Sequence, residues 1–176
     1  MFDQVNGLPA HPLIVHAPLV LIGLTLLLGL LYVVVPPIRS KTDWALVLLA
    51  LAGPVSALLA TVSGERLAVR LGGSEAITQH EKWGELTRNV SAVLLVVVLA
   101  LVVVDRLRRR RKRRQRALAE GDDPGAPART VGGGVWTLLS VVLSVLLLVV
   151  GGTAGAYLYL TGESGAKMVW GTTIQR

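Results

Sequence analysis

Four long apolar segments decide what this sequence can fold into. They cover residues 13–35, 44–62, 83–104 and 135–160. A helix of about 20 apolar residues crosses the roughly 30 Å hydrocarbon layer of a bilayer, and it pairs its backbone polar groups internally, as lipid requires. With 52% hydrophobic residues and a mean hydropathy of +0.60, the 176-residue chain is too apolar for a soluble domain. The segments therefore predict an all-α integral membrane four-helix bundle, a single domain over 1–176.

The basic residues lie on one side of these segments. The loop 105–134 holds ten Lys or Arg against four acids, and the turn 36–43 adds two more basic residues. Loops rich in Lys and Arg stay in the cytoplasm. This pattern predicts that the N-terminus, the connection 64–89 and the C-terminus lie outside. The whole net charge of +7 is then carried by the inner side.

Nine of the eleven residues at positions 106–116 are basic. In a soluble protein such a run would suggest nucleic-acid binding. Next to a membrane helix it is explained by topology and by attraction to anionic lipid headgroups, about 1 kcal/mol per charge. We therefore expect the lipid bilayer and its anionic lipids as partners, and no nucleic acid. The stretch 120–134, rich in Gly, Pro and Asp, is typical of a flexible connection.

The two halves of the chain show a short similarity. A segment containing His11 and His16 leads into a first helical hairpin that ends in Ser-Gly-Glu at 63–65, and His80 leads into a second that ends in Thr-Gly-Glu at 161–163. Two hairpins of like orientation would be related by an axis along the membrane normal. The alternative is a chance match between Gly-rich helix ends.

Small and polar residues are spaced three or four apart in three of the segments. In the second and fourth they allow close helix packing, which predicts that these two helices form the centre of the bundle. In the third they predict a polar stripe that points inward. The residues are Ala50, Gly53, Ala57, Ala60 and Gly64, then Ser140, Ser144, Gly151, Gly155 and Gly162, and in the third segment His80, Gly84, Thr87 and Ser91.

All three histidines and four glutamates are expected at the outer ends of the helices. They are His11, His16, His80, Glu65, Glu81, Glu85 and Glu163. Ionisable groups near membrane depth are candidates for function because their burial is costly. The alternative is that they are hydrated interfacial groups or that a histidine caps a helix. His11 and His16 stand about 140° apart on a helix, so they cannot bind one ion from one face, but either could reach His80.

Several of these motifs resemble a bacterial family. The N-terminal segment 7–18, with its two His and three Pro, together with 63–65 and 161–170, is similar to the four-helix membrane proteins of domain-of-unknown-function family 2231. The resemblance covers nearly the whole chain. It implies a multi-pass protein of the bacterial cytoplasmic (inner) membrane and, in some relatives, association with redox modules such as Rieske-type proteins. Relatives often have a His after the glycine that matches Gly162, where this chain has Glu163, which weakens any carry-over of haem or metal binding to the fourth helix.

The sequence favours a non-catalytic envelope or scaffold component with a redox or envelope protein partner. It has no phosphate-binding Gly loop, no Gly-x-Ser-x-Gly elbow and no paired His of metalloprotease type, so it does not favour an enzyme. The absence of cysteine excludes disulfides, thiolate iron–sulfur clusters, c-type haem attachment and thiol catalysis.

Two other functions remain as hypotheses. The first is an electron-transfer subunit with a b-type haem held near the outer face between His80 and His16, or as a second choice His11. The second is divalent-metal binding or transport by the outer histidines and glutamates, because His with carboxylates suits ions such as Zn²⁺.

Overall fold

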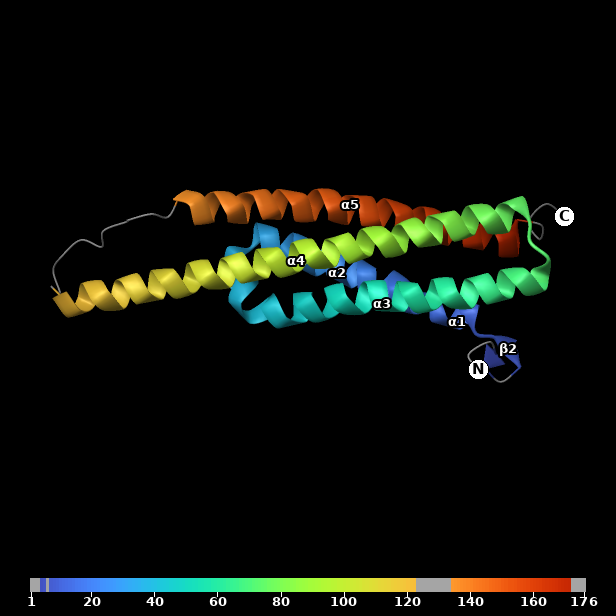
Figure 1. Ribbon diagram of the computed structural model, residues 1–176, viewed down its shortest axis with the longest axis horizontal. Helices are drawn as coiled ribbons and strands as arrows, with labels where there is room; N and C mark the ends of the chain where they lie inside the picture. Colours follow the sequence, from blue (N-terminus) through green and yellow to red (C-terminus); the bar gives the residue numbers. More distant parts are fainter. Residues whose placement is uncertain (1–3, 6, 123–133, 172–176) are drawn as a thin grey trace.

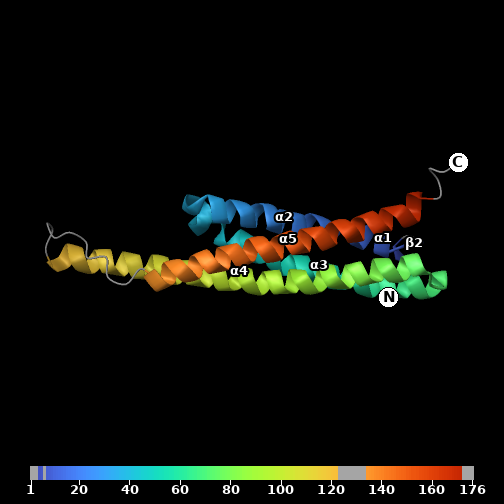
Figure 2. The same ribbon diagram turned by 90° about the horizontal axis from the view of Figure 1, so that it is seen from above.

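Four long helices follow the four apolar segments. The computed structural model describes residues 4–5, 7–122 and 134–171, and its helices lie side by side along one axis (Figures 1 and 2). Each is long and apolar enough to cross a membrane, which confirms the predicted all-α four-helix membrane architecture. The helices are α2 (His16–Val34), α3 (Arg39–Leu71), α4 (Glu75–Asp122) and α5 (Gly134–Trp170).

Short elements precede α2 and α3. The one-turn helix α1 (His11–Ile14) has a proline in its first turn, where the missing N–H costs nothing, and the 3₁₀ turn η1 (Pro36–Ile38) joins α2 to α3. Two two-residue strands, β1 (Gln4–Val5) and β2 (Leu8–Pro9), pair antiparallel before α1. These elements bring His11 to the end of α3 that lies away from the basic residues of α4. This end of the bundle is called the outer end and the opposite, basic end the inner end, after the orientation that the sequence predicts.

The helices continue well past the apolar segments. The outer ends of α3 and α4 are joined by a tight turn, in which Gly72 ends α3 in the left-handed conformation (φ +79°) and Ser74 accepts a hydrogen bond from the Ile77 N–H at 3.2 Å. At the inner end α4 reaches Asp122, so that residues 105–122 of the expected loop are helical. Eight of its eighteen residues are Arg, and Lys, Gln, Leu and Ala supply six more, all of them strong helix formers. Residues 123–133 of the expected loop lie outside the described residues.

Each helix packs against its neighbours in the chain, and α2 against α5 closes the bundle. Among the described residues α3 and α5 hardly touch each other, so they lie diagonally across the bundle. The prediction that these two form the centre was wrong. Their glycines instead receive side chains of α2: a Cβ on Gly53 would lie 3.1 Å from Ile22 Cγ1, and a Cβ on Gly151 or Gly155 would lie 3.2 or 3.1 Å from methyl carbons of Leu26.

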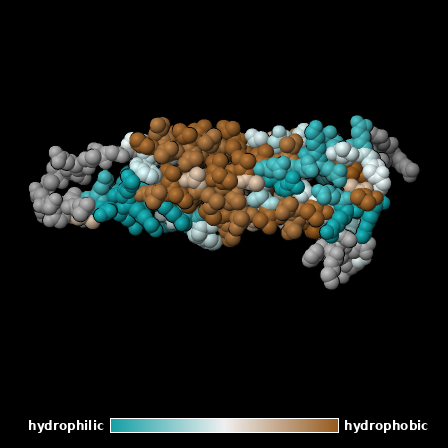
Figure 3. Space-filling model, in the orientation of Figure 1, coloured by the Kyte–Doolittle hydropathy of each residue, from teal (hydrophilic) through white to brown (hydrophobic). Residues whose placement is uncertain are grey.

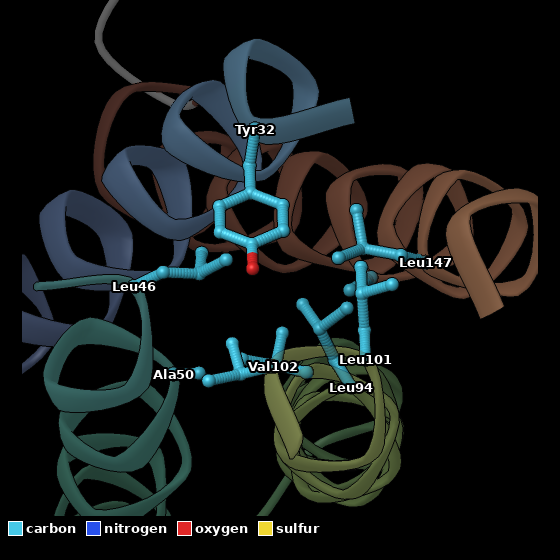
Figure 4. Close-up of a cluster of buried hydrophobic side chains, with 9 residues drawn as sticks. Tyr32, Leu46, Ala50, Leu94, Leu101, Val102 and Leu147 are labelled. Carbon is cyan, nitrogen blue, oxygen red and sulfur yellow. The ribbon is translucent and has the colours of Figure 1, made fainter. Parts of the chain in front are cut away.

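Apolar side chains form a core in the bundle and also cover much of its exposed surface. A cluster of buried side chains fills the bundle around Tyr32, Leu101 and Leu147 (Figure 4). On the face drawn in Figure 3, a broad hydrophobic band covers the middle of the molecule, with hydrophilic residues toward both ends. Exposed Leu and Val in such a band suit contact with lipid rather than water.

The two hairpins bury corresponding positions. Every buried residue of α2 has a buried counterpart 69 positions later in α4: Pro18 and Thr87, Ile22 and Ser91, Thr25 and Leu94, Gly29 and Val98, Tyr32 and Leu101. Four buried residues of α3 likewise have counterparts 101 positions later in α5: Asp43 and Ser144, Leu46 and Leu147, Ala50 and Gly151, Gly53 and Ala154. The matching burial supports two similar hairpins of like direction, with a longer inner connection in the second. It also confirms that Thr87 and Ser91 of the polar stripe point inward.

Candidate functional site

Two histidines from different halves of the chain meet at the outer end of the bundle. His11 opens α1 and His80 lies in the second turn of α4, and their ring centroids are 6.2 Å apart at an interplanar angle of 86°. Both side chains are partly buried, whereas His16 is exposed and forms no hydrogen bond or ion pair with the described residues. The structure therefore brings His11, rather than His16, to His80.

The ring of His11 is fixed by α3. Its Nδ1 lies 3.0 Å from the Ala60 carbonyl oxygen and 3.1 Å from Ser63 Oγ, while the Ser63 hydroxyl donates to the same carbonyl at 2.9 Å. A carbonyl oxygen only accepts hydrogen bonds, so Nδ1 carries the hydrogen. In the neutral ring the lone pair is then on Nε2.

The ring of His80 is fixed by α5 in the same way. Its Nδ1 lies 2.9 Å from Ser164 Oγ, and that hydroxyl donates to the Thr161 carbonyl at 3.0 Å. Since the Ser164 hydrogen is already used, its oxygen accepts from Nδ1–H of His80. The lone pair of this ring is again on Nε2.

Glycines let both rings lie against the neighbouring helices. A Cβ on Gly64 would be 2.9 Å from His11 Cε1, and a Cβ on Gly165 would be 3.2 Å from His80 Cε1. These contacts show that Ser63-Gly64 of the first hairpin corresponds to Ser164-Gly165 of the second. The sequence had instead aligned Ser63-Gly64 with the Thr-Gly pair three residues earlier. The structural alignment has an offset of 101 residues, the same as that between the buried positions of α3 and α5.

The four candidate glutamates do not join the histidines. Glu65 and Glu85 are exposed and Glu81 is half-buried, while Glu163 pairs with Lys167 at 2.8 Å. Within the described ranges, no three His, Asp or Glu side chains are grouped so that they could hold a metal ion.

A cavity of about 360 Å³ opens beside this site between the outer ends of α4 and α5. Its walls include Gln79 and Trp83 of α4 and the Glu163 and Lys167 pair of α5. Trp83 also stacks on Tyr157, with the ring centroids 5.8 Å apart.

The inner end of the bundle holds a buried network of charges. Asp43 and Asp105 are only 4% and 3% exposed. Asp43 accepts hydrogen bonds from the Tyr32 hydroxyl at 2.8 Å, from Arg106 Nε at 2.9 Å and from Arg109 Nη2 at 2.6 Å. A carboxylate removed from water needs such partners, because an unpaired buried charge is strongly unfavourable.

Asp105 is held by the other helices. It accepts from Ser140 Oγ at 2.7 Å and from Arg39 Nη1 at 2.9 Å. The same guanidinium donates to the carbonyls of Tyr32 at 2.7 Å and Val33 at 3.2 Å, which the inner end of α2 leaves without intrahelical partners. The inner ionic cluster is therefore Tyr32 of α2, Arg39 and Asp43 of α3, Asp105, Arg106 and Arg109 of α4, and Ser140 of α5, and it joins all four helices.

A family assignment agrees with this architecture. The family described as predicted membrane protein (DUF2231) matches residues 7–176. The chain belongs to this family. No curated protein and no solved structure matches it. For this DUF2231 protein the family supports the membrane location, and the two ends of the bundle are where its side chains suggest function.

Beyond the inner ionic cluster, α4 carries a run of exposed positive charge. All seven residues at 110–116 are exposed, and six of them are Arg or Lys. The guanidinium of Arg111 lies 4.5 Å from the ring centre of Trp136 at the start of α5, a cation–π contact that ties α5 to the first turn of this run. We call residues 110–116 the basic extension.

The sequence reasoning missed the inner ionic cluster. Its signal was present as two isolated aspartates, Asp43 and Asp105, at the ends of apolar segments and next to basic residues. Tyr32, less than one turn from the end of the first segment, lies at the same depth. Since charges within membrane helices are costly, such acids suggest a paired network.

Proposed function

We propose that this DUF2231 protein is a non-catalytic scaffold component of the bacterial cytoplasmic membrane, with the inner ionic cluster and basic extension facing the cytoplasm and both termini outside. The main support for this proposal is the basic extension. The inner ionic cluster fixes its position relative to the membrane helices. Figure 1 places the basic extension beyond the inner ends of α2 and α3. A rigid helical projection of this kind suits binding to another molecule rather than catalysis.

The orientation follows from charge. Short connections rich in Lys and Arg are rarely translocated across the bilayer, so they remain in the cytoplasm. The basic extension, Arg39 and Lys41 are all near one end of the bundle, and the turn between α3 and α4 is at the other. Both α3 and α5 run outward from the basic end, which supports an outer location for the C-terminus.

The charge also supports contact with anionic lipid. Near a cytoplasmic leaflet each Lys or Arg contributes about 1 kcal/mol of attraction. Arg106, Arg109 and Arg111 adjoin the apolar band and can reach phosphate oxygens while keeping their contacts with Asp43 and Trp136, because a guanidinium has five donors. The later residues of the basic extension would remain available to an acidic surface of a protein partner.

The polar interior supports a structural role. Among the described residues, no buried side-chain nitrogen or oxygen lacks a hydrogen-bond partner. A fully paired network stiffens and specifies a fold. The inner ionic cluster would thus fix the helix positions from which the basic extension projects.

The lipid part is tested by reconstituting the full chain in nanodiscs of mixed zwitterionic and anionic phospholipid and measuring the anionic lipid retained after detergent extraction. A variant with the six basic residues of the basic extension changed to Gln should retain less. The matched control changes Lys82 and Lys167, at the other end, to Gln and should retain the normal amount. Equal retention in all three proteins would contradict the proposal.

The scaffold part needs a protein partner. Crosslinking in cells followed by purification should return a stable partner with the unmodified chain, and a smaller yield with the variant of the basic extension. Failure to recover a stable partner would count against a scaffold and leave the lipid result unaffected.

A further inference from the structure

We propose that His11 and His80 form a two-histidine site for a divalent late transition-metal ion, copper or zinc, at the outer end of the bundle. This site is separate from the scaffold function and lies at the opposite end of the molecule from the inner ionic cluster. It uses one residue from each hairpin.

Both rings are prepared for coordination by their surroundings. A metal-binding histidine normally donates its second N–H to a carbonyl or another acceptor, which fixes the tautomer and the ring orientation. His11 meets this condition through the Ala60 carbonyl, and His80 meets it through Ser164. The Nε2 lone pair of each ring is therefore the donor that a metal ion would use.

The separation of the rings is close to what one ion needs. With metal–imidazole bonds of about 2.0–2.1 Å, two ring centres are roughly 5 Å apart at a tetrahedral angle, as zinc prefers, and about 6 Å apart on opposite sides of the ion, as in a square-planar copper site. The ring centroids of His11 and His80 are 6.2 Å apart. Small rotations about the side-chain torsions would complete the geometry, with water in the remaining coordination positions.

The donor set indicates the class of ion. Two neutral imidazoles suit zinc and copper, whereas oxygen ligands are required for magnesium or calcium. Within the described part of the chain, neither Glu81 nor Glu85 joins the two histidines in a group that could hold a metal ion. The site would therefore be open, with exchangeable water, rather than a closed structural site.

A single ion fits this site better than a haem. A haem would need room for its porphyrin around the iron. The backbones of α3 and α5 instead approach the Cε1 edge of each ring, at Gly64 and Gly165. A single ion requires no such room.

The test uses asparagine variants of the full-length protein in detergent or nanodiscs. An Asn amide can replace Nδ1 as the donor to Ala60 or Ser164, so His11→Asn and His80→Asn keep the anchoring bond and remove only Nε2. His16→Asn is the matched control. Zn²⁺ binding is measured by titration calorimetry, and the nitrogen ligands of bound Cu²⁺ by electron paramagnetic resonance.

We expect one metal ion per chain, two nitrogen ligands in the Cu²⁺ spectrum, and a Kd raised by at least about tenfold in each of His11→Asn and His80→Asn but unchanged in His16→Asn. An elution profile and melting temperature like those of the unmodified chain establish that the variants are folded. Absence of binding, equal loss in the control, or a stoichiometric Soret band that disappears in His80→Asn would overturn the proposal, the last because haem would then be the occupant.

Discussion

The Tyr32 hydroxyl donates a hydrogen bond of 2.8 Å to Asp43, and the two residues are almost completely buried, at 0% and 4% exposed. This bond crosses between α2 and α3, and the same carboxylate binds two arginines of α4. Figure 4 shows the tyrosine ring directed into the bundle with its oxygen at the centre. Ion pairs thus join the helices at the inner end, and the hydrogen bonds of His11 and His80 join them at the outer end.

Asp105→Asn should lower the free energy of unfolding by about 3 kcal/mol, because Arg39 would lose the charge that compensates it in a poorly hydrated position. Reversible unfolding in mixed micelles measures the change. Tyr32→Phe, which removes one hydroxyl and leaves the ion pairs, should cost only about 1 kcal/mol. Similar losses in the two variants would show that the ion pair contributes no more than one neutral hydrogen bond.

Glu163→Gln serves as the exposed counterpart of that experiment. Its pair with Lys167 lies on the surface at the other end of the bundle, where such pairs stabilise little. We expect no measurable change in the same unfolding assay. A loss comparable to that of Asp105→Asn would mean that the assay does not distinguish buried from exposed pairs.

Arg39→Lys should destabilise the protein although it keeps the positive charge. The guanidinium bonds to Asp105, to the Tyr32 carbonyl and to the Val33 carbonyl at once, and a lysine ammonium cannot reproduce this forked geometry. We expect a loss of about 1–3 kcal/mol in the unfolding free energy. The control Lys41→Arg, at an exposed position of the same turn, should leave stability unchanged.

Gly64→Ala and Gly165→Ala should displace the paired histidines. A new Cβ would lie 2.9 Å from His11 Cε1 or 3.2 Å from His80 Cε1, so each ring must move. Zn²⁺ affinity should fall in both variants. Gly152→Ala is the matched control, because its Cβ would have no neighbour within 4 Å. Unchanged affinity at Gly64 and Gly165 would show that the position of the rings is not critical for binding.

The membrane fold could be predicted from sequence because lipid imposes a simple rule. Each segment had to satisfy its backbone bonds internally, which left helices, and the positions of Lys and Arg separated the two ends. The helix ends could not be predicted this way, since the last turns of α3 and the basic extension of α4 are polar sequences that continue the helices beyond the apolar segments. Hydropathy reports only the part of a helix that lies in lipid.

The sites were predicted less completely. His11 and His80 were among the candidates, but choosing His11 over His16 required the one-turn helix α1, which turns the first ring toward Ala60. The inner ionic cluster depends on side chains from four helices at one depth. No local pattern encodes that depth, because it follows from the packing of α2, α3, α4 and α5.

The orientation of the basic extension is the central claim, and single-cysteine labelling in intact cells tests it most directly. The chain has no cysteine, so Lys112→Cys and Glu75→Cys each introduce a single thiol at an exposed position. A membrane-impermeant maleimide should label Glu75→Cys in intact spheroplasts and Lys112→Cys only after the membrane is broken. Labelling of Lys112→Cys in intact spheroplasts, with Glu75→Cys protected, would contradict the account.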